Sequence, residues 1–416
     1  MHKKACLLGL GSLLLQCSLS LAQDAISAAQ AAPREGCVAV LEAPTPLGEW
    51  TPCCSRCETI WANAEFLLWW TKSIPAPTPM LTQATNLADP TSGQLGSANT
   101  AILLGGQSYD PGTRFGGRFT FGGWLDANRG IGLEGTYLFI APSSTTARSS
   151  TDGSAASPLI GSPIFNAFTG KEDFLGLAGP GFAGGASLTV SNELQSGELN
   201  LVKRLYEDQQ LRITGLIGFR YVSFDENLVF SSSNHGTPGN DPGSFYSESD
   251  HFGANNNFYG ANFGLRGEYQ MGRVFVNASA KCALGAMNQT VNISGSATDV
   301  GPGGPPFNFV LPTGIFAVPT NIGSHNQTVF AVVPEANFNL GYAITNNIRA
   351  TVGYSFLYLS NVARPGTAVD HAINPTQSYS ISSSGSQLIG TPAPTFSFSR
   401  SDFWAQGINF GLEFKF

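Results

Sequence analysis

Residues 407–416 read GINFGLEFKF, a stretch in which apolar and polar residues alternate up to the last position. A β-strand places successive side chains on opposite faces, so this stretch has one apolar face and one polar face. The apolar face carries Ile408, Phe410, Leu412, Phe414 and Phe416, whereas Asn409, Glu413 and Lys415 lie on the other. The pattern predicts a strand with one face in hydrocarbon and the other toward polar groups.

The composition indicates that much of the surface does not face water. Of the 416 residues, 42% are hydrophobic and 12% are charged, whereas soluble domains carry about 25% charged residues. Beyond the N-terminus, the sequence contains no run of about 20 apolar residues, which argues against a helical membrane protein. The net charge of −7 and the lack of a Lys/Arg cluster argue against nucleic acid as a partner.

The N-terminus has the features of an export signal. Lys3 and Lys4 precede an apolar run, and Ser20-Leu21-Ala22 resembles a small-x-small cleavage site, so residues 1–22 are predicted to be a signal peptide. The alternative is a lipoprotein signal that uses Cys17, although Gln16 occupies a position that prefers a small residue. Residues 23–58 lack periodicity and are interpreted as an Ala-, Pro- and Cys-rich periplasmic leader.

Export places the cysteines in an oxidising compartment. Disulfides are therefore predicted for the leader cysteines, with their pairing open: Cys37, Cys53, Cys54 and Cys57. Metal binding and free or intermolecular thiols are the alternatives, but no histidine lies near the CCSRC cluster. Cys282 occupies an apolar strand position and is interpreted as a small hydrophobic residue.

From Ile60 onward, period-two segments follow one another along the chain. They lie at residues 60–70, 114–126, 130–140, 197–205, 211–228, 258–269, 273–285, 328–342, 348–360 and 402–416. This pattern predicts about ten strands, and strand-like fragments between the segments leave twelve or more open. Pro334 donates no hydrogen bond to a ladder, so a bulge is expected there.

Short and long links alternate between these segments. Short turns are expected near residues 126–130, 206–210, 269–273 and 343–347, and long links near residues 72–113, 142–186, 232–256, 295–325 and 362–399. This alternation predicts a transmembrane antiparallel up-and-down β-barrel of about 10–12 strands at residues 59–416, with short periplasmic turns and long extracellular loops. In hydrocarbon only a closed barrel pairs every backbone group of such strands. The expected location is the bacterial outer membrane, with outer-membrane lipid as a partner.

Aromatic residues concentrate near the ends of the predicted strands: Trp69, Trp70, Trp124, Tyr137, Tyr354, Tyr358 and Trp404. Girdles at the two membrane interfaces would place them there. The alternative is that aromatic residues are simply common in strands.

Several segments together resemble a known family: IWANAEFLLWWTKS, GGRFTFGGWLDANRGIGLEGTYLFI, GFRYVSFDENL, SNVARPGTAVDHAINP and DFWAQGINFGLEFKF. They are similar to the outer-membrane β-barrel porin family seven, which is found chiefly in planctomycete bacteria. The resemblance runs from about residue 59 to residue 416 and excludes residues 23–58. It implies a barrel fold and an outer-membrane location, and it assigns no substrate.

With the apolar faces directed outward, the charged residues of the strands are expected to face the lumen. They are Glu65, Arg118, Glu134, Glu198, Arg212, Arg220, Arg266, Glu268, Lys281, Glu335, Arg349 and Glu413. Their signs nearly balance, so acid–base pairs could cross-link the barrel wall. Alternatively, some of these groups could line a water-filled pore.

These observations favour a porin that lets small solutes diffuse passively through a narrow, mixed-charge lumen. The alternative is a closed structural or adhesive cell-surface barrel without transport, because ten to twelve strands lie between filled and open barrels. The oligomeric state stays open. The long loops are interpreted as solvated segments, with an Arg364–Asp370 pair holding the loop at residues 362–399.

Catalytic and cofactor-binding patterns are missing from the sequence. His235, His251, His325 and His371 all fall in predicted long loops, and none has metal-ligand spacing to another. We therefore expect no enzyme activity, no cofactor and no metal site.

The closing stretch also resembles the C-terminal signal by which the barrel assembly machinery recognises its substrates. Phe410, Leu412, Phe414 and Phe416 would form the recognised face. The alternative is a merely amphipathic edge strand that would tolerate loss of the last residue.

Overall fold

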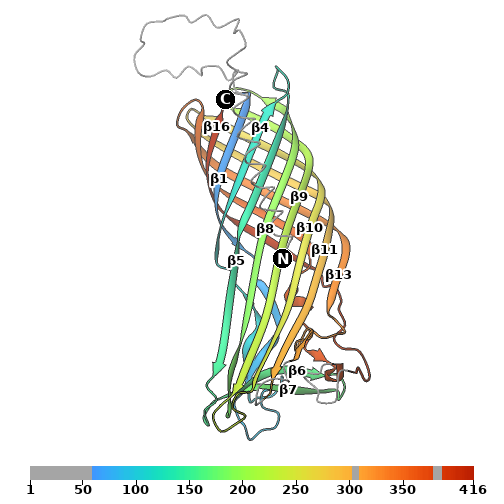
Figure 1. Cartoon of the computed structure of the whole chain (residues 1–416). Helices are drawn as coiled ribbons and strands as arrows, with labels where there is room; N and C mark the ends of the chain where they lie inside the picture. The colour runs from blue at the N-terminus through green and yellow to red at the C-terminus, as the bar shows by residue number, and fades with distance from the viewer. Residues whose placement is uncertain (1–58, 302–308, 378–386) are drawn as a thin grey trace, which may run out of the picture. The chain divides into compact units, whose positions relative to one another are not determined.

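The computed structural model describes residues 59–301, 309–377 and 387–416. The predicted signal peptide, the leader and its cysteines lie outside these residues. Within them, ten antiparallel strands form a closed ring, because β10 pairs with β11 at the two ends of the strand order (Figure 1). Around the ring, these strands are β1 (Ile60–Thr71), β4 (Thr113–Trp124), β5 (Ile131–Thr151), β8 (Phe182–Glu207), β9 (Leu211–Gly236), β10 (Phe245–Met271), β11 (Val274–Val300), β13 (Gly323–Ala343), β14 (Ile348–Val362) and β16 (Ser401–Lys415).

The first and last strands of the ring pair with each other and close the barrel. In β1, the register with β16 runs from Trp61 opposite Lys415 to Thr71 opposite Ala405. On its other side β1 pairs with β4 along nearly its whole length. A closed barrel of this kind is what the alternating sequence predicts, and the fold class is confirmed. No helix in the described part of the chain is long and apolar enough to span a membrane.

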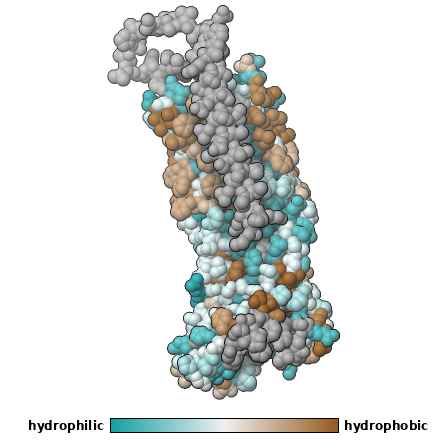
Figure 2. All heavy atoms as spheres, in the orientation of Figure 1, coloured by the Kyte–Doolittle hydropathy of each residue, from teal (hydrophilic) through white to brown (hydrophobic). Residues whose placement is uncertain are grey.

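Apolar side chains cover the outside of the barrel near its short turns. Phe115, Phe119 and Phe121 on β4 are more than half exposed, as are Leu199 on β8 and Ile217 on β9. Large exposed apolar residues of this density are stable only against hydrocarbon or another protein. Figure 2 shows this surface as a brown region in the upper part of the molecule, and we call it the lipid belt.

All four short turns predicted from the sequence are confirmed. They join β4 to β5, β8 to β9, β10 to β11 and β13 to β14 at one end of the barrel. Asp126 closes the first of them by accepting hydrogen bonds from the backbone N–H groups of Gly130 and Ile131. Such Asx turns allow a chain to reverse within a few residues.

The expectation of long solvated links is wrong at several places, because the strands continue into them. Strands β8 to β11 reach 26 or 27 residues, against the roughly 9–11 residues that a tilted strand needs to cross a membrane. The predicted link at residues 232–256 shrinks to the eight positions between Gly236 and Phe245. These strands therefore form a wall that stands well beyond the lipid belt on the side opposite the short turns.

Along a long strand, the apolar residues move from the outer face to the inner face. This change of face is the reason why the sequence did not predict the wall. On β8, Leu199 and Leu201 are exposed in the belt while Glu198 faces inward. Further along the same strand, Leu188 and Val190 are fully buried while the alternate positions are Ser and Thr. Lipid requires an apolar exterior, whereas water requires a polar one, so the pattern inverts at the membrane boundary.

A second sheet covers the inner face of the wall. It comprises β2 (Ile74–Ala84), β3 (Thr100–Tyr109), β6 (Leu159–Asn166), β7 (Lys171–Ala178) and the short β15 (Ala372–Ile373). An apolar core lies between this sheet and the wall, and it includes Met80, Ile164, Phe230 and Phe252, each at 0% exposure. The links thus form a folded extracellular layer, to which β12 (Phe309–Leu311) and the 3₁₀ turns at Pro365–Ala368 and Pro375–Gln377 also belong.

Two local expectations are wrong. Pro334 needs no bulge, because the β11–β13 register runs through it without a shift and β13 pairs with β14 only from Glu335 onward. Trp69 does not belong to an interfacial girdle, since it is fully buried and its Nε1 donates to Asn409 Oδ1 at 2.8 Å. Trp69 lies on the same face of β1 as Glu65 and Leu67, because alternate residues of a strand share a face, so it points into the lumen.

Candidate functional site: the filled lumen

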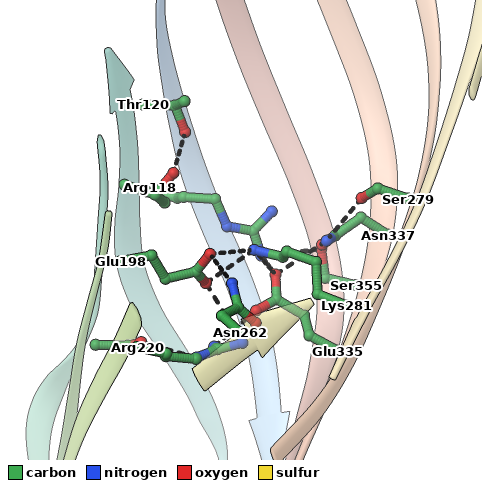
Figure 3. A network of polar contacts seen from close by, with 12 residues as sticks. Arg118, Thr120, Glu198, Arg220, Asn262, Ser279, Lys281, Glu335, Asn337 and Ser355 are labelled. Carbon is green, nitrogen blue, oxygen red and sulfur yellow. Dashed lines mark hydrogen bonds and ion pairs between the residues drawn. The ribbon is translucent and has the colours of Figure 1, made fainter. Parts of the chain in front are cut away.

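A layer of charged side chains crosses the barrel at the level of the lipid belt (Figure 3). Each belongs to an inward position of a different strand, because alternate residues of every strand point into the lumen. The layer consists of Glu65 on β1, Arg118 on β4, Glu198 on β8, Arg220 on β9, Lys281 on β11 and Glu335 on β13. These side chains are all less than a tenth exposed.

Several ion pairs of this layer connect strands that are not neighbours in the ring. Glu335 receives Arg220 Nη2 at 2.7 Å, Lys281 Nζ at 3.4 Å and Arg118 Nη2 at 3.5 Å. Lys281 Nζ also lies 2.8 Å from Glu198 Oε1, and Arg118 Nη1 lies 2.9 Å from Glu65 Oε2. The three cations and three carboxylates balance, so the layer carries no net charge.

Neutral polar groups complete the layer. Asn262 Nδ2 donates to Glu198, and Asn337 Nδ2 donates to Glu335 at 2.9 Å. The Ser355 hydroxyl accepts from Arg118 Nη2 and donates to Asn337 Oδ1. Buried charges are tolerated only when paired and hydrogen-bonded. Every charge of the network has an ion-pair partner, whereas Arg118 Nε and Asn262 Oδ1 lack a hydrogen-bond partner among the described residues.

A second charged layer lies at the end of the barrel that carries the short turns. Arg266 donates to both carboxylate oxygens of Glu134, at 2.6 and 2.9 Å, and Trp61 Nε1 adds a third bond at 3.0 Å. Arg349 Nη1 donates to Glu268 at 3.0 Å. A cavity of about 80 Å³ lies here, lined in part by these groups and by Arg212, Glu413 and Lys415. It has room for a few waters and ends below the first charged layer.

An apolar layer fills the lumen on the extracellular side of the ion pairs. Trp69, Phe224, Phe258 and Leu357 are at 0% exposure within it. The rings of Phe224 and Phe403 have centroids 4.1 Å apart. Phe224 belongs to β9 and Phe403 to β16, which lie opposite each other in the ring. Side chains from opposite walls therefore touch across the barrel axis.

A buried ion pair joins the lumen to the extracellular layer. Arg364 Nη2 donates to Glu226 Oε1 at 2.6 Å and to the Ser73 carbonyl at 2.9 Å, and both charged side chains are at 0% exposure. The predicted partner of Arg364 was Asp370, and this expectation is wrong because Asp370 is exposed in a separate turn. Glu226 lies six residues from Arg220 on β9, so both side chains share the inward face of the strand. The period-two pattern could therefore have predicted that Glu226 points into the barrel.

The structure brings the residues predicted for the lumen into two groups. The first layer contains Glu65, Arg118, Glu198, Arg220, Lys281 and Glu335, and the second contains Glu134, Arg212, Arg266, Glu268, Arg349 and Glu413. The list of lumen residues predicted from the sequence omits Glu226, Arg114 and Asp250, although Arg114 lies on the predicted polar face of its strand. Arg114 is buried and donates to the Asn192 carbonyl at 3.1 Å. It occupies an inward position of β4, as Arg118 does.

The histidines lie away from the charged layers. Three of them belong to the extended strands rather than to loops, namely His235, His251 and His325. His325 stacks on Phe396 with ring centroids 4.0 Å apart, and His251 Nε2 lies 3.2 Å from Asn227 Oδ1. Among the described residues, no group of His, Cys, Asp and Glu has the geometry of a metal site.

Known proteins place this barrel in a family. A family model described as putative beta barrel porin-7 matches residues 61–416. The chain belongs to this family. The family and the fold locate it in the bacterial outer membrane, as the sequence predicted. No curated relative matches the chain.

Solved structures resemble this family member only in outline. The outer membrane protease OmpT from Escherichia coli is 10% identical, with a TM-score of 0.39, over 87% of this chain and 98% of that one. A Pseudomonas aeruginosa FadL homologue is 7% identical, with a TM-score of 0.24, over 86% and 90% of the two chains. The P. putida toluene transporter TodX is 7% identical, with a TM-score of 0.21, over 86% and 89%.

Proposed function

We propose that this protein is a closed outer-membrane barrel that holds a folded layer at the cell surface and passes no solute in the conformation described. The contact of Phe224 with Phe403 carries the proposal, because these rings come from opposite walls and meet at 4.1 Å. The sequence favoured passive diffusion through a narrow, mixed-charge lumen over a closed barrel. The contacts across the lumen support the closed barrel as the first candidate.

The number of strands in the ring supports a closed barrel. About eight strands leave space only for side chains, whereas 16–18 strands leave an aqueous channel. In this ring of ten strands, the two charged layers and the apolar layer place side chains across the lumen. A conducting path would have to separate buried aromatic rings and break ion pairs that have no solvent to replace their partners.

Passive diffusion remains the second candidate, because the family is described as a group of beta barrel porins. It requires that the apolar layer and the first charged layer move aside together. Catalysis is not proposed. His371 lies 3.7 Å from Glu172 and 3.9 Å from Asp370, but no group of His, Cys, Asp and Glu in the described residues could hold a metal ion.

Conductance in planar lipid bilayers distinguishes the two candidates. We expect the purified full-length protein to insert without discrete conductance steps at any voltage that the bilayer withstands. Discrete steps from the unmodified protein would overturn the closed barrel and support diffusion.

Variants locate the barrier. We expect the double variant F224A/F403A to conduct, because it removes the rings that meet across the axis. The matched control is F219A/F410A, which removes two rings of the same size from the lipid-facing side. Conductance in both variants, or in neither, would contradict a barrier at Phe224 and Phe403.

A further inference from the structure

The outer surface of the extracellular wall consists largely of short polar side chains arranged in rungs across β8, β9, β10, β11 and β13. One rung above the lipid belt runs through Ser223, Asn257, Asn288 and Thr328. The next runs through Asp225, Asn255, Thr290 and Asn326. In Figure 2 this part of the molecule is mostly teal and white, with scattered brown spheres.

The side chains of these rungs are already ordered by bonds to one another. Thr290 Oγ1 donates to Asn326 Oδ1 at 2.7 Å, and Thr328 Oγ1 donates to Asn288 Oδ1 at 2.9 Å. Asn255 Nδ2 donates to Asp225 Oδ1 at 2.7 Å. Short, preorganised side chains on a rigid sheet lose little entropy when they bind a partner, unlike the long Lys and Glu chains of ordinary surfaces.

An aromatic pair stands at the foot of these rungs. Tyr221 and Tyr259 face each other across β9 and β10, with ring centroids 5.1 Å apart. The Tyr221 hydroxyl donates to Asn257 Oδ1 at 2.7 Å and so connects the rings to the first rung. Phe219 lies on the next rung toward the short turns, opposite Ala261, and Phe263 lies one rung beyond it. Both are exposed residues of the lipid belt.

We propose that this foot, formed by Tyr221, Asp225, Asn255, Asn257 and Tyr259, binds the neutral sugar headgroup of a glycolipid in the outer leaflet. The site is continuous with the lipid belt, so acyl chains packed on Phe219 and Phe263 place their headgroups at this height. The inference goes beyond the proposed function and does not depend on whether the lumen conducts.

The chemistry of the site fits sugar hydroxyls better than charged headgroups. Amide and hydroxyl groups donate and accept at once, as sugar hydroxyls do, and the Asp225 carboxylate accepts without a cation beside it in the site. The tyrosine rings offer apolar faces to the C–H groups of a pyranose. A phosphate headgroup would find no Lys or Arg among these five residues and would face a carboxylate.

Native mass spectrometry from nanodiscs tests the site on the full-length protein. The probe is digalactosyl diacylglycerol mixed equally with phosphatidylcholine, and the readout is the number of lipids of each kind retained by the ejected barrel. We expect retention of the glycolipid over phosphatidylcholine. The triple variant N255A/N257A/Y259A should lower that preference about tenfold, as expected when several net hydrogen bonds are lost.

The control triple variant is S231A/S249A/S296A, which removes hydroxyls from the same wall farther from the membrane. It should keep the wild-type preference, because a disaccharide headgroup does not reach that height. Equal retention of both lipids by the unmodified protein would overturn the proposal. Equal loss in both triple variants would also overturn it. So would stronger retention of anionic phosphatidylglycerol than of the glycolipid from nanodiscs in which phosphatidylglycerol replaces phosphatidylcholine.

Discussion

At the scale of single residues, the extracellular layer depends on Asp250, which the sequence did not single out, and on Arg364, for which the sequence predicted a different partner. Asp250 is fully buried on β10 and accepts hydrogen bonds from the backbone N–H groups of Phe316 and Ala317, at 3.0 and 2.7 Å. It holds the segment around residues 313–318 against the wall. Arg364 does the same for the following link through Glu226. Both connect segments that are distant in the sequence.

Asp250 makes the stability of this layer depend on pH. Burial raises the pKa of its carboxyl from 3.8 to about 7, although the backbone N–H groups oppose that shift. The folded state therefore binds the proton more tightly than the unfolded state. The stability contribution is complete below about pH 4 and is lost progressively as the pH rises to about 7. Urea unfolding in detergent micelles should give a lower midpoint at neutral pH than at mildly acidic pH.

The variant D250N should remove this slope, because its amide oxygen still accepts from Phe316 and Ala317 but does not titrate in this range. The control D370N, which replaces an exposed carboxylate, should keep the wild-type slope. An unchanged slope in D250N would assign the pH dependence to other groups.

Removal of Arg364 should destabilise the protein strongly. The variant R364A leaves the Glu226 carboxylate buried without its cation, which costs about 3–5 kcal/mol of unfolding free energy. Equilibrium unfolding measures the loss. The double variant R364M/E226M should recover most of it, because replacing both charges with apolar groups is often neutral. R148A, at an exposed arginine, is the control and should change the unfolding free energy by less than about 0.5 kcal/mol.

At the scale of elements, the sequence predicted the strands that cross the membrane and missed their extensions. Its segments at residues 60–70 and 402–416 correspond closely to β1 and β16. The sequence predicts only residues 197–205 of β8, 211–228 of β9, 258–269 of β10 and 273–285 of β11 as strand. Farther out, the exposed positions are mostly Ser, Thr and Asn and the buried positions are mostly apolar. In a membrane-spanning strand the exposed positions are apolar, so these outer parts show the reverse pattern. Their Ser-, Thr- and Asn-rich composition is also typical of a solvated link.

The last strand supports a prediction about assembly. Phe410 and Leu412 are exposed on the outer face of β16, and Phe416, which follows the strand, is also exposed. The Phe416 N–H donates to the Ile60 carbonyl at 2.9 Å. The variant F416A keeps this backbone bond and removes only the ring. If the ring is an assembly signal, F416A should yield several-fold less heat-modifiable barrel in the outer membrane.

F416Y should restore assembly, because it retains an aromatic ring at the same position. I348A, which shortens a half-buried apolar residue paired with Phe414, tests whether any loss of packing at this end has the same effect. Normal assembly of F416A would refute the signal.

At the scale of the whole molecule, the ring geometry decides which charges meet. Glu335 on β13 contacts Arg220 on β9, Lys281 on β11 and Arg118 on β4, and only β11 is its neighbour in the ring. The alternation of apolar and polar residues along each strand predicts that each of these residues points inward. The partners depend on the diameter and stagger of the barrel, which no single strand encodes.

This layer yields a further prediction about stability. The variant E335Q leaves three buried cations with two carboxylates, so the temperature at which the barrel loses its folded electrophoretic mobility should fall by several degrees. The double variant E335Q/K281M restores the charge balance and should recover part of the loss. E413Q is the control, because Glu413 lies in the second layer and is partly exposed. Equal losses in E335Q and E413Q would argue against a special role for the first layer.

The sequence by itself determined the strand periodicity, the four short turns, the parity of each charged residue and the membrane location. These are local properties, because lipid on one side of a strand fixes which residue types alternate along it. Only the tertiary structure decided that the links fold into a second sheet, that Arg364 pairs with Glu226 and that aromatic rings meet across the axis. Those outcomes depend on closure of the ring, which brings together strands separated by hundreds of residues and sets the width of the space between them.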